Sequence, residues 1–194
     1  MLSAHEACMD ITDSDCGMPD KMTDYTTEIA YGENISGIPA SLISAIIQVE
    51  SGGDTWAVRY EPDFFNTYLA VVHSVSPLPG VFPPGVSADT ERRLRACSFG
   101  LMQIMGETAR EEGFTGTFLT ELCNPTIGIL YGSLLLRSKK DKYYDAYGWD
   151  GVIAGYNAGS PRKNQDGTFV NQDYVDKVRV NFSLRQSELT AGLG

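Results

Sequence analysis

One glutamate, Glu50, occupies a position where the sequence predicts a carboxyl group on a buried helix face. Three isoleucines recur at the spacing of one helical face (Ile43, Ile46 and Ile47). Glu50 continues that face seven residues after Ile43. Burial disfavours the ionised carboxylate, and so does the negative end of the helix macrodipole, because Glu50 would lie in the last turn. Both effects raise its pKa, and a carboxylic acid protonated near neutral pH can act as a general acid in glycosidic cleavage. A glutamate that only frays out with the helix end has no such role.

Two further segments place polar side chains among apolar or small residues. Gln103 is a lone amide in the apolar run 100–105, so its polar end needs a backbone or ligand partner. Tyr156 and Asn157 stand at a helix end, between small residues that let backbone or a ligand approach closely. Taken singly, each segment is more often explained by packing. Our hypothesis is that these two segments and Glu50 line one cleft.

The elements that position these residues are predicted to be mainly α-helical. Pro39 suits a first helical position, and Gly52-Gly53 would end that helix. Residues 54–99 contain five prolines and scattered aromatic residues, so we expect a long, partly ordered loop insertion there. Asp166-Gly167 indicates a turn, at most of a small β hairpin. The expected helices cover residues 21–33 (ending near Gly32), 39–50, 106–112, 126–140, 150–158 and 172–184.

The length and charge of the chain limit its organisation and partners. Its 194 residues suit one domain, which we expect over 21–185 between a polar arm (1–20) and a tail (186–194). The net charge of −10 argues against nucleic acid or an anionic membrane as partner. We find no apolar run of the ~20 residues that span a bilayer, and no secretory signal over residues 1–10. Binding of an anionic polymer would therefore depend on local contacts in a cleft.

The spacing of the cysteines and histidines predicts no metal site. The four cysteines match no zinc pattern, and only His5 and His73 could assist them. We expect free or occasionally paired thiols, with a bridge between Cys8 and Cys16 left open. No glycine-rich phosphate loop or Ser-His-Asp pattern is present, so no cofactor is indicated.

Four segments in a fixed order resemble the signature of the soluble lytic transglycosylase (SLT) domain, of the goose-type-lysozyme-like superfamily. They are Glu50-Ser51-Gly52-Gly53, Gly100-Leu101-Met102-Gln103-Ile104-Met105, Ala154-Gly155-Tyr156-Asn157-Ala158-Gly159 and the closing Tyr174-Val175-Asp176-Lys177-Val178. The resemblance spans about residues 25–182 and implies a single-domain lysozyme-like fold. The insertion, with Trp56-Ala57-Val58-Arg59-Tyr60-Glu61-Pro62, is similar to versions carried by bacteriophages and prophages.

The resemblance implies a reaction on peptidoglycan glycan strands. Glu50 would protonate the oxygen linking N-acetylmuramic acid to N-acetylglucosamine. It would then accept the proton of the muramic C6 hydroxyl as that oxygen attacks C1, leaving a 1,6-anhydro sugar. We expect a monomer that acts in the periplasm or at the cell wall, virion-associated or released at lysis. Sugar groups would be held, or Glu50 oriented, by Ser51, Gln103, Tyr156 and Asn157. Tyr174 would line the cleft near Glu50, and Met102 would supply a backbone or apolar contact.

Two other functions remain open from the sequence. A lysozyme-type hydrolase needs a second carboxylate, about 5–5.5 Å away for retention or roughly 6.5–9.5 Å for inversion. Asp54, Glu61 and Asp63 are the candidates, with Glu61 the one to test; its structural alternative is an ion pair with Arg59. The other function is a non-catalytic cell-wall-binding or virion structural module. Glu50 argues against such a module, because a pure binder does not need a carboxylic acid in so costly an environment.

Overall fold

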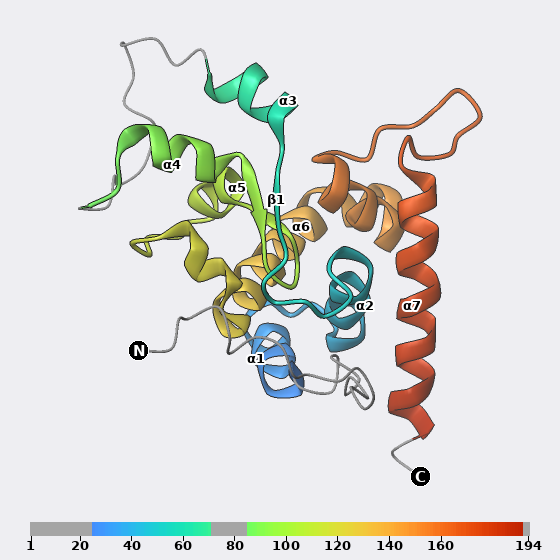
Figure 1. Cartoon of the computed structure of the whole chain (residues 1–194). Helices are drawn as coiled ribbons and strands as arrows, with labels where there is room; N and C mark the ends of the chain where they lie inside the picture. Colours follow the sequence, from blue (N-terminus) through green and yellow to red (C-terminus); the bar gives the residue numbers. More distant parts are fainter. Residues whose placement is uncertain (1–24, 71–84, 192–194) are drawn as a thin grey trace, which may run out of the picture.

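The computed structural model describes residues 25–70 and 85–191, with side chains described to residue 184. The chain is mainly α-helical, as predicted (Figure 1). The predicted arm 1–20 and residues 71–84 lie outside the described residues. The helices are α1 (Thr26–Ser36), α2 (Ala40–Glu50), α3 (Pro62–Phe64), the π-helix η2 (Phe65–Leu69), α4 (Ala88–Arg95), α5 (Gly106–Glu111), the 3-10 helix η3 (Leu119–Cys123), α6 (Pro125–Ala158) and α7 (Gln172–Ala191).

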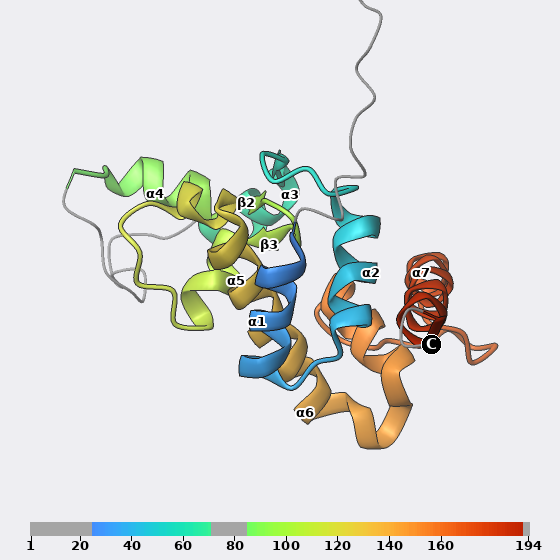
Figure 2. The same ribbon diagram turned by 90° about the horizontal axis from the view of Figure 1, so that it is seen from below.

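Helix α2 lies at the centre of the fold, and its apolar face is buried as its sequence predicts. Its three periodic isoleucines are completely buried. α2 packs against α7 on one side and contacts α1 on the other, while α1 packs along α6 (Figures 1 and 2). Burial of each isoleucine contributes about 1.5–3 kcal/mol. The last turn of α2, which carries Glu50, is therefore held firmly by the core.

The long helix α6 contains a break that the sequence signals only in part. Asn124 caps its start by accepting hydrogen bonds from the backbone of Thr126 and Ile127, and Pro125 follows at the first position. The helix continues past the predicted end at 140, and Gly148 then adopts a non-helical conformation (φ 61°, ψ −160°). This kink turns the remaining segment, which ends at Ala158, back toward α2 (Figure 2). The separate helix expected over 150–158 is thus the second arm of α6.

The ends of two other helices differ from the prediction. α1 continues through Gly32, where a Cβ would lie 2.8 Å from the Ser133 hydroxyl oxygen, so this glycine allows close packing on α6 rather than ending the helix. α1 ends instead before Gly37, whose φ of 68° is left-handed. α7 continues to Ala191 and takes in most of the predicted tail.

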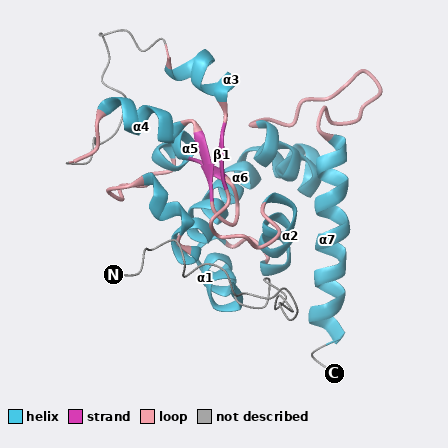
Figure 3. Ribbon diagram, in the orientation of Figure 1, coloured by secondary structure: helices cyan, strands magenta, loops and turns pink. Residues whose placement is uncertain are grey.

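A three-stranded antiparallel sheet adds to the helices, where the sequence predicts at most one hairpin. The strands are β1 (Val58–Tyr60), β2 (Cys97–Phe99) and β3 (Ile104–Met105), in the order β1-β2-β3 (Figure 3). β1 pairs with β2 across the whole insertion, with Arg59 opposite Ser98. The predicted turn at Asp166-Gly167 forms too, but only one isolated bridge joins Lys163 and Phe169 beside it.

The described parts of the insertion are more ordered than predicted. Besides β1 and β2, they form α3, η2 and α4. Ser87 caps α4 by accepting a hydrogen bond from the Thr90 backbone. Glu91 and Arg95 of α4 are completely buried and pair with each other, and Glu91 also pairs with Arg110 of α5. The insertion is therefore anchored by buried charges, which a hydrophobic pattern does not reveal.

Two further features concern the thiols and the helices. Cys97 and Cys123 are buried and free. Cys8 and Cys16, whose pairing the sequence leaves open, lie outside the described residues. No helix in the described ranges has the length and apolar character needed to cross a bilayer.

Candidate active site

The carboxyl group of Glu50 lies at the C-terminal end of α2, half-buried, as the helix periodicity predicts. Burial raises its pKa above the ordinary value of 4.5. Two smaller effects lower the pKa: a hydrogen bond from Tyr174, and the positive charge of Arg59. The Tyr174 hydroxyl donates to Glu50 Oε1 at 2.6 Å. Within the described residues Glu50 forms no ion pair, so its main polar partner is a neutral hydroxyl.

Ser51 joins the end of α2 to the turn between β2 and β3. Its hydroxyl donates to the carbonyl of Leu101 at 2.8 Å and accepts from the backbone N–H of Gly53 at 3.2 Å. The turn itself requires Gly100, whose φ is 67° and where a Cβ would lie 2.5 Å from the Leu122 carbonyl oxygen. Ser51 therefore positions the backbone next to Glu50 and does not line the pocket described below.

Gln103 has backbone partners for its amide, one of the two alternatives the sequence allows. Its Nε2 donates to the carbonyls of Ala57 (3.0 Å) and Gly100 (2.9 Å), and its Oε1 accepts from the Ser98 hydroxyl at 3.1 Å. Its φ of 46° is unusual for a residue other than glycine. The amide thus connects the sheet to the chain that follows α2, and its side chain also forms part of the pocket wall.

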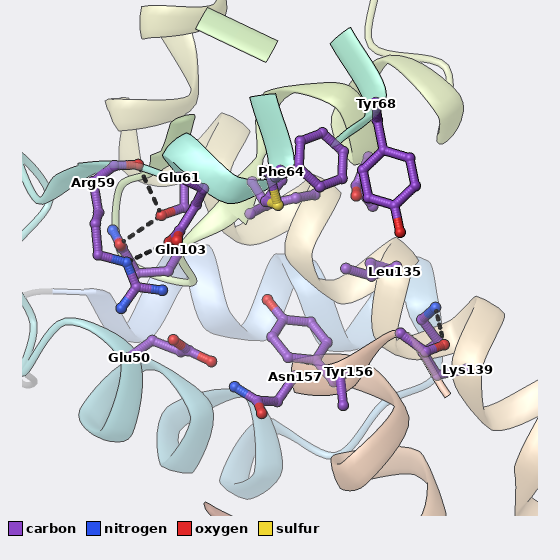
Figure 4. Close-up of a pocket in the computed structure, with 16 residues that line it drawn as sticks. Glu50, Arg59, Glu61, Phe64, Tyr68, Gln103, Leu135, Lys139, Tyr156 and Asn157 are labelled. Atoms are coloured by element: carbon purple, nitrogen blue, oxygen red, sulfur yellow. Dashed lines mark hydrogen bonds and ion pairs between the residues drawn. The ribbon is translucent and has the colours of Figure 1, made fainter. Parts of the chain in front are cut away.

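Tyr156 and Asn157 approach the site from the end of α6. The buried Tyr156 hydroxyl donates to the carbonyl of Met102 at 2.7 Å. Burial, and secondarily the charge of Glu50, raise the pKa of Tyr156 and of Tyr174, so both phenols remain neutral donors. Asn157 Oδ1 accepts from Asn171 Nδ2 at 3.0 Å, and its own amide nitrogen points toward Glu50 (Figure 4).

Met102 lies in the core rather than at the surface of the cleft. Its side chain is completely buried, and a Cβ on Gly132 of α6 would lie 2.5 Å from its sulfur. Its carbonyl is already bound by Tyr156. In this structure Met102 therefore positions Tyr156 and is not among the pocket-lining residues.

A pocket of about 530 Å³ opens beside Glu50 (Figure 4). Five of the eight predicted site residues line it: Glu50, Glu61, Gln103, Tyr156 and Asn157. The other three do not line the pocket but contact groups next to it. Ser51 donates to the Leu101 carbonyl, the Met102 carbonyl accepts from Tyr156, and Tyr174 donates to Glu50. The three segments that the sequence suggests for one cleft do come together here.

Glu61 lies on the pocket wall in an ion pair with Arg59. Arg59 Nε lies 2.5 Å from Glu61 Oε1, which matches the structural alternative considered from the sequence. The side chains are 71% and 31% exposed, respectively. Neither Asp54 nor Asp63 lines the pocket. Glu61 is therefore the second carboxylate of this pocket, and a guanidinium neutralises it.

Several pocket residues were not predicted from the sequence. Phe64 and Tyr68 come from α3 and η2 of the insertion, and Leu135 and Lys139 come from α6. Lys139 follows Leu135 by four residues, so a lysine on an apolar helix face was a usable signal. Asn171 is not among the lining residues, but it holds Asn157 through a contact that joins segments 14 residues apart across a turn, and the sequence did not predict this contact.

Comparison with known proteins identifies the family. The family model described as Transglycosylase SLT domain matches residues 28–174. The match runs from α1 to the start of α7 and includes Glu50, Gln103, Tyr156 and Tyr174. A comparison with curated proteins gave no match. The chain belongs to the transglycosylase SLT domain family, whose activity is on peptidoglycan.

Proposed function

We propose that this protein is a lytic transglycosylase that cleaves the β-1,4 bond between N-acetylmuramic acid and N-acetylglucosamine, with Glu50 as acid and then base. The observation that carries the proposal is the setting of Glu50. It lines the pocket, burial raises its pKa, and its hydrogen-bond partner is the neutral Tyr174. A carboxylic acid kept protonated at a pocket wall suits proton donation to a leaving oxygen.

The proposed reaction needs only one carboxyl group, which gives up one proton and takes one back. Glu50 gives its proton to the glycosidic oxygen as the bond from that oxygen to muramic C1 breaks. The C6 hydroxyl oxygen of the same sugar then bonds to C1, and its proton passes to the Glu50 carboxylate. The product ends in a 1,6-anhydro ring, Glu50 is protonated again, and no water is consumed.

Neighbouring residues support both proton transfers. After the first transfer Glu50 is an anion, and the Tyr174 hydroxyl donates to that anion. The amide nitrogen of Asn157, which points toward Glu50, is placed to hold a sugar oxygen there (Figure 4). Gln103 contributes to the wall, and Tyr156 fixes this wall to the 100–103 turn through Met102.

A lysozyme-type hydrolase is the second candidate, because Glu61 lines the same pocket. Such an enzyme uses its second carboxylate as a base or nucleophile. The Arg59 guanidinium occupies one oxygen of Glu61, which weighs against both roles.

Mass spectrometry of the soluble products of peptidoglycan digestion tests the proposal. We expect products that end in 1,6-anhydromuramic acid from the wild-type protein and none from Glu50→Gln. Reducing-end products would identify a hydrolase and direct attention to Glu61. No products from wild-type protein that still binds peptidoglycan would indicate a binding module.

A further inference from the structure

The end of the pocket away from Glu50 has a different chemical character. Here Phe64 and Tyr68 of the insertion face Leu135 and Lys139 of α6 (Figure 4). None of these four residues belongs to the segments that carry the family resemblance. This end therefore combines aromatic rings and an aliphatic side chain with one ammonium group.

Tyr68 supplies an aromatic surface at this end. Its side chain is 66% exposed although it stands beside a pocket, and its ring is 4.9 Å from that of Phe64, centroid to centroid. In Figure 4 its hydroxyl end is directed toward Leu135. An exposed aromatic ring, supported from behind and set against an apolar side chain, is suited to the apolar face of a sugar ring.

Lys139 differs from the other cation of the pocket. Arg59 is neutralised by Glu61, whereas Lys139 Nζ donates to the backbone carbonyl of Gly159 at 3.0 Å and forms no ion pair with any described residue. Burial, followed by the charge of Lys142, lowers its pKa, while the smaller effects of Glu112 and Glu111 raise it. An ammonium has three donors, so two remain for a ligand.

The charge of the whole protein makes this ammonium significant. The chain carries a net charge of −10, which disfavours the approach of an anionic polymer. An anionic group on the substrate therefore needs a local cation, and Lys139 is a lining cation that forms no ion pair with a carboxylate in the described part of the chain.

We propose that Tyr68 and Lys139 form a subsite for a carboxylate-bearing muramyl unit, in which Tyr68 contacts the sugar and Lys139 binds the carboxylate. The inference rests on the proposed function, since it takes peptidoglycan as the ligand. The carboxylate has two possible sources, namely the stem peptide or the lactyl group of peptide-free muramic acid. In both cases Lys139 makes the protein prefer charged over neutral strands.

Binding measured in the Glu50→Gln variant tests the subsite without cleavage. The probes are soluble glycan strands whose amino groups are acetylated, used in three forms. The first keeps its stem peptides and their carboxylates, the second has all carboxylates converted to methylamides, and the third is trimmed by an amidase to leave the lactyl carboxylate. Affinities are measured by calorimetry.

We expect Lys139→Met and Lys139→Gln to weaken binding of the first probe about tenfold, the size expected for a lost charge-assisted hydrogen bond. Neither variant should change binding of the methylamide probe. Lys139→Gln can still donate to Gly159, which separates the loss of charge from the loss of that hydrogen bond. Lys177→Met, at an exposed lysine of α7 outside the pocket lining, is the matched control and should bind every probe like the parent. Tyr68→Ala should weaken all three probes alike.

The trimmed strands distinguish the two sources of the carboxylate. If the Lys139 variants also bind the trimmed strands more weakly, the carboxylate belongs to the lactyl group. If they bind only the first probe more weakly, the carboxylate belongs to the stem peptide. Equal losses on the charged and methylamide probes, or no loss with either Lys139 variant, would overturn the subsite alone. Absence of binding to any probe would contradict the proposed function as well.

Discussion

Glu50 and Glu91 are both withdrawn from water, but the groups around them differ in charge. Glu91 is completely buried in α4, and its Oε1 accepts from Arg95 at 3.2 Å and from Arg110 at 2.9 Å. Glu50 is half-buried at a pocket wall, and its close partner is the neutral hydroxyl of Tyr174. The first arrangement stabilises a charge and holds two helices together. At Glu50, burial without an ion pair to a described residue favours a proton on the carboxyl group, so this residue can supply an acid.

The comparison shows what separates a structural from a chemical carboxyl group in this chain. Both carboxyl groups are withdrawn from water, but Glu91 contacts two guanidinium groups whereas Glu50 contacts a neutral hydroxyl. Arg95 of α4 and Arg110 of α5 pair with Glu91, whereas Arg59, the cation whose charge acts on the pKa of Glu50, pairs with Glu61. Substitutions at the two sites should therefore affect different properties.

Glu50→Gln should have the largest effect, and on turnover. Loss of a general acid and base lowers kcat on the order of 10²–10⁴-fold. The fold should tolerate the change, because a neutral amide replaces a carboxyl group that burial already disfavours in its charged form. Release of soluble fragments from peptidoglycan measures the activity and chemical denaturation measures stability. The control is Glu33→Gln, which changes an exposed glutamate in the same way. If turnover of Glu50→Gln stayed within a few-fold of wild type, Glu50 would not be the acid and base of the reaction.

Glu91→Gln should reverse this pattern, with the larger effect on stability. Two buried guanidinium groups would lose their shared carboxylate, which costs about 3 kcal/mol of unfolding free energy. The matched control is Asp89→Asn, which removes the exposed ion pair with Arg93 on the same helix and should change stability little. Urea unfolding measures both. If Glu91→Gln were as stable as Asp89→Asn, the buried network would not anchor the insertion.

Tyr174→Phe should alter the pH profile and lower the rate moderately. The Tyr174 hydroxyl donates to Glu50 and lowers its pKa, so its removal should raise that pKa further and move the alkaline limb of the activity profile to higher pH. The rate should fall about tenfold, because a hydrogen bond to the carboxylate is lost. A pH profile of kcat/KM measures both effects, and an alkaline limb that moved to lower pH would contradict the assignment.

Glu61→Gln should have the smallest effect. Its partner Arg59 is 71% exposed, and such pairs contribute about 0–1 kcal/mol. Activity should therefore stay within about threefold of wild type. A loss of 100-fold or more, measured on the same peptidoglycan, would make Glu61 a second catalytic carboxylate and favour the hydrolase.

The parts of the site that the sequence predicts correctly depend on local pattern. Helix α2 follows from its isoleucine spacing, and the position of Glu50 follows from the helix. Gln103 was expected to need a partner because an amide in an apolar run must be satisfied, and it has backbone partners. Such inferences need only near neighbours in the chain.

What the sequence does not predict depends on contacts between distant segments. Strands β1 and β2 are three residues each and pair across the insertion, so no hairpin pattern marks them. Helix α4 is rich in charged residues, and the burial of its Glu91 is explained only when Arg110 of α5 lies beside it. Tyr68 and Lys139 likewise line the same pocket although they are far apart in the sequence.

The most direct test of the central claim is the protonation equilibrium of Glu50 itself. A carbon-13 NMR titration of labelled glutamate carboxyl groups, with Glu50→Gln to assign the signal, would give its pKa. We predict a value above the ordinary 4.5. Because the folded pKa is then above the unfolded one, the wild-type protein should lose stability relative to Glu50→Gln as the pH rises from 4.5 through the folded value. A pKa at or below 4.5 would contradict the account, since Glu50 would then be a carboxylate stabilised by its surroundings and not an acid.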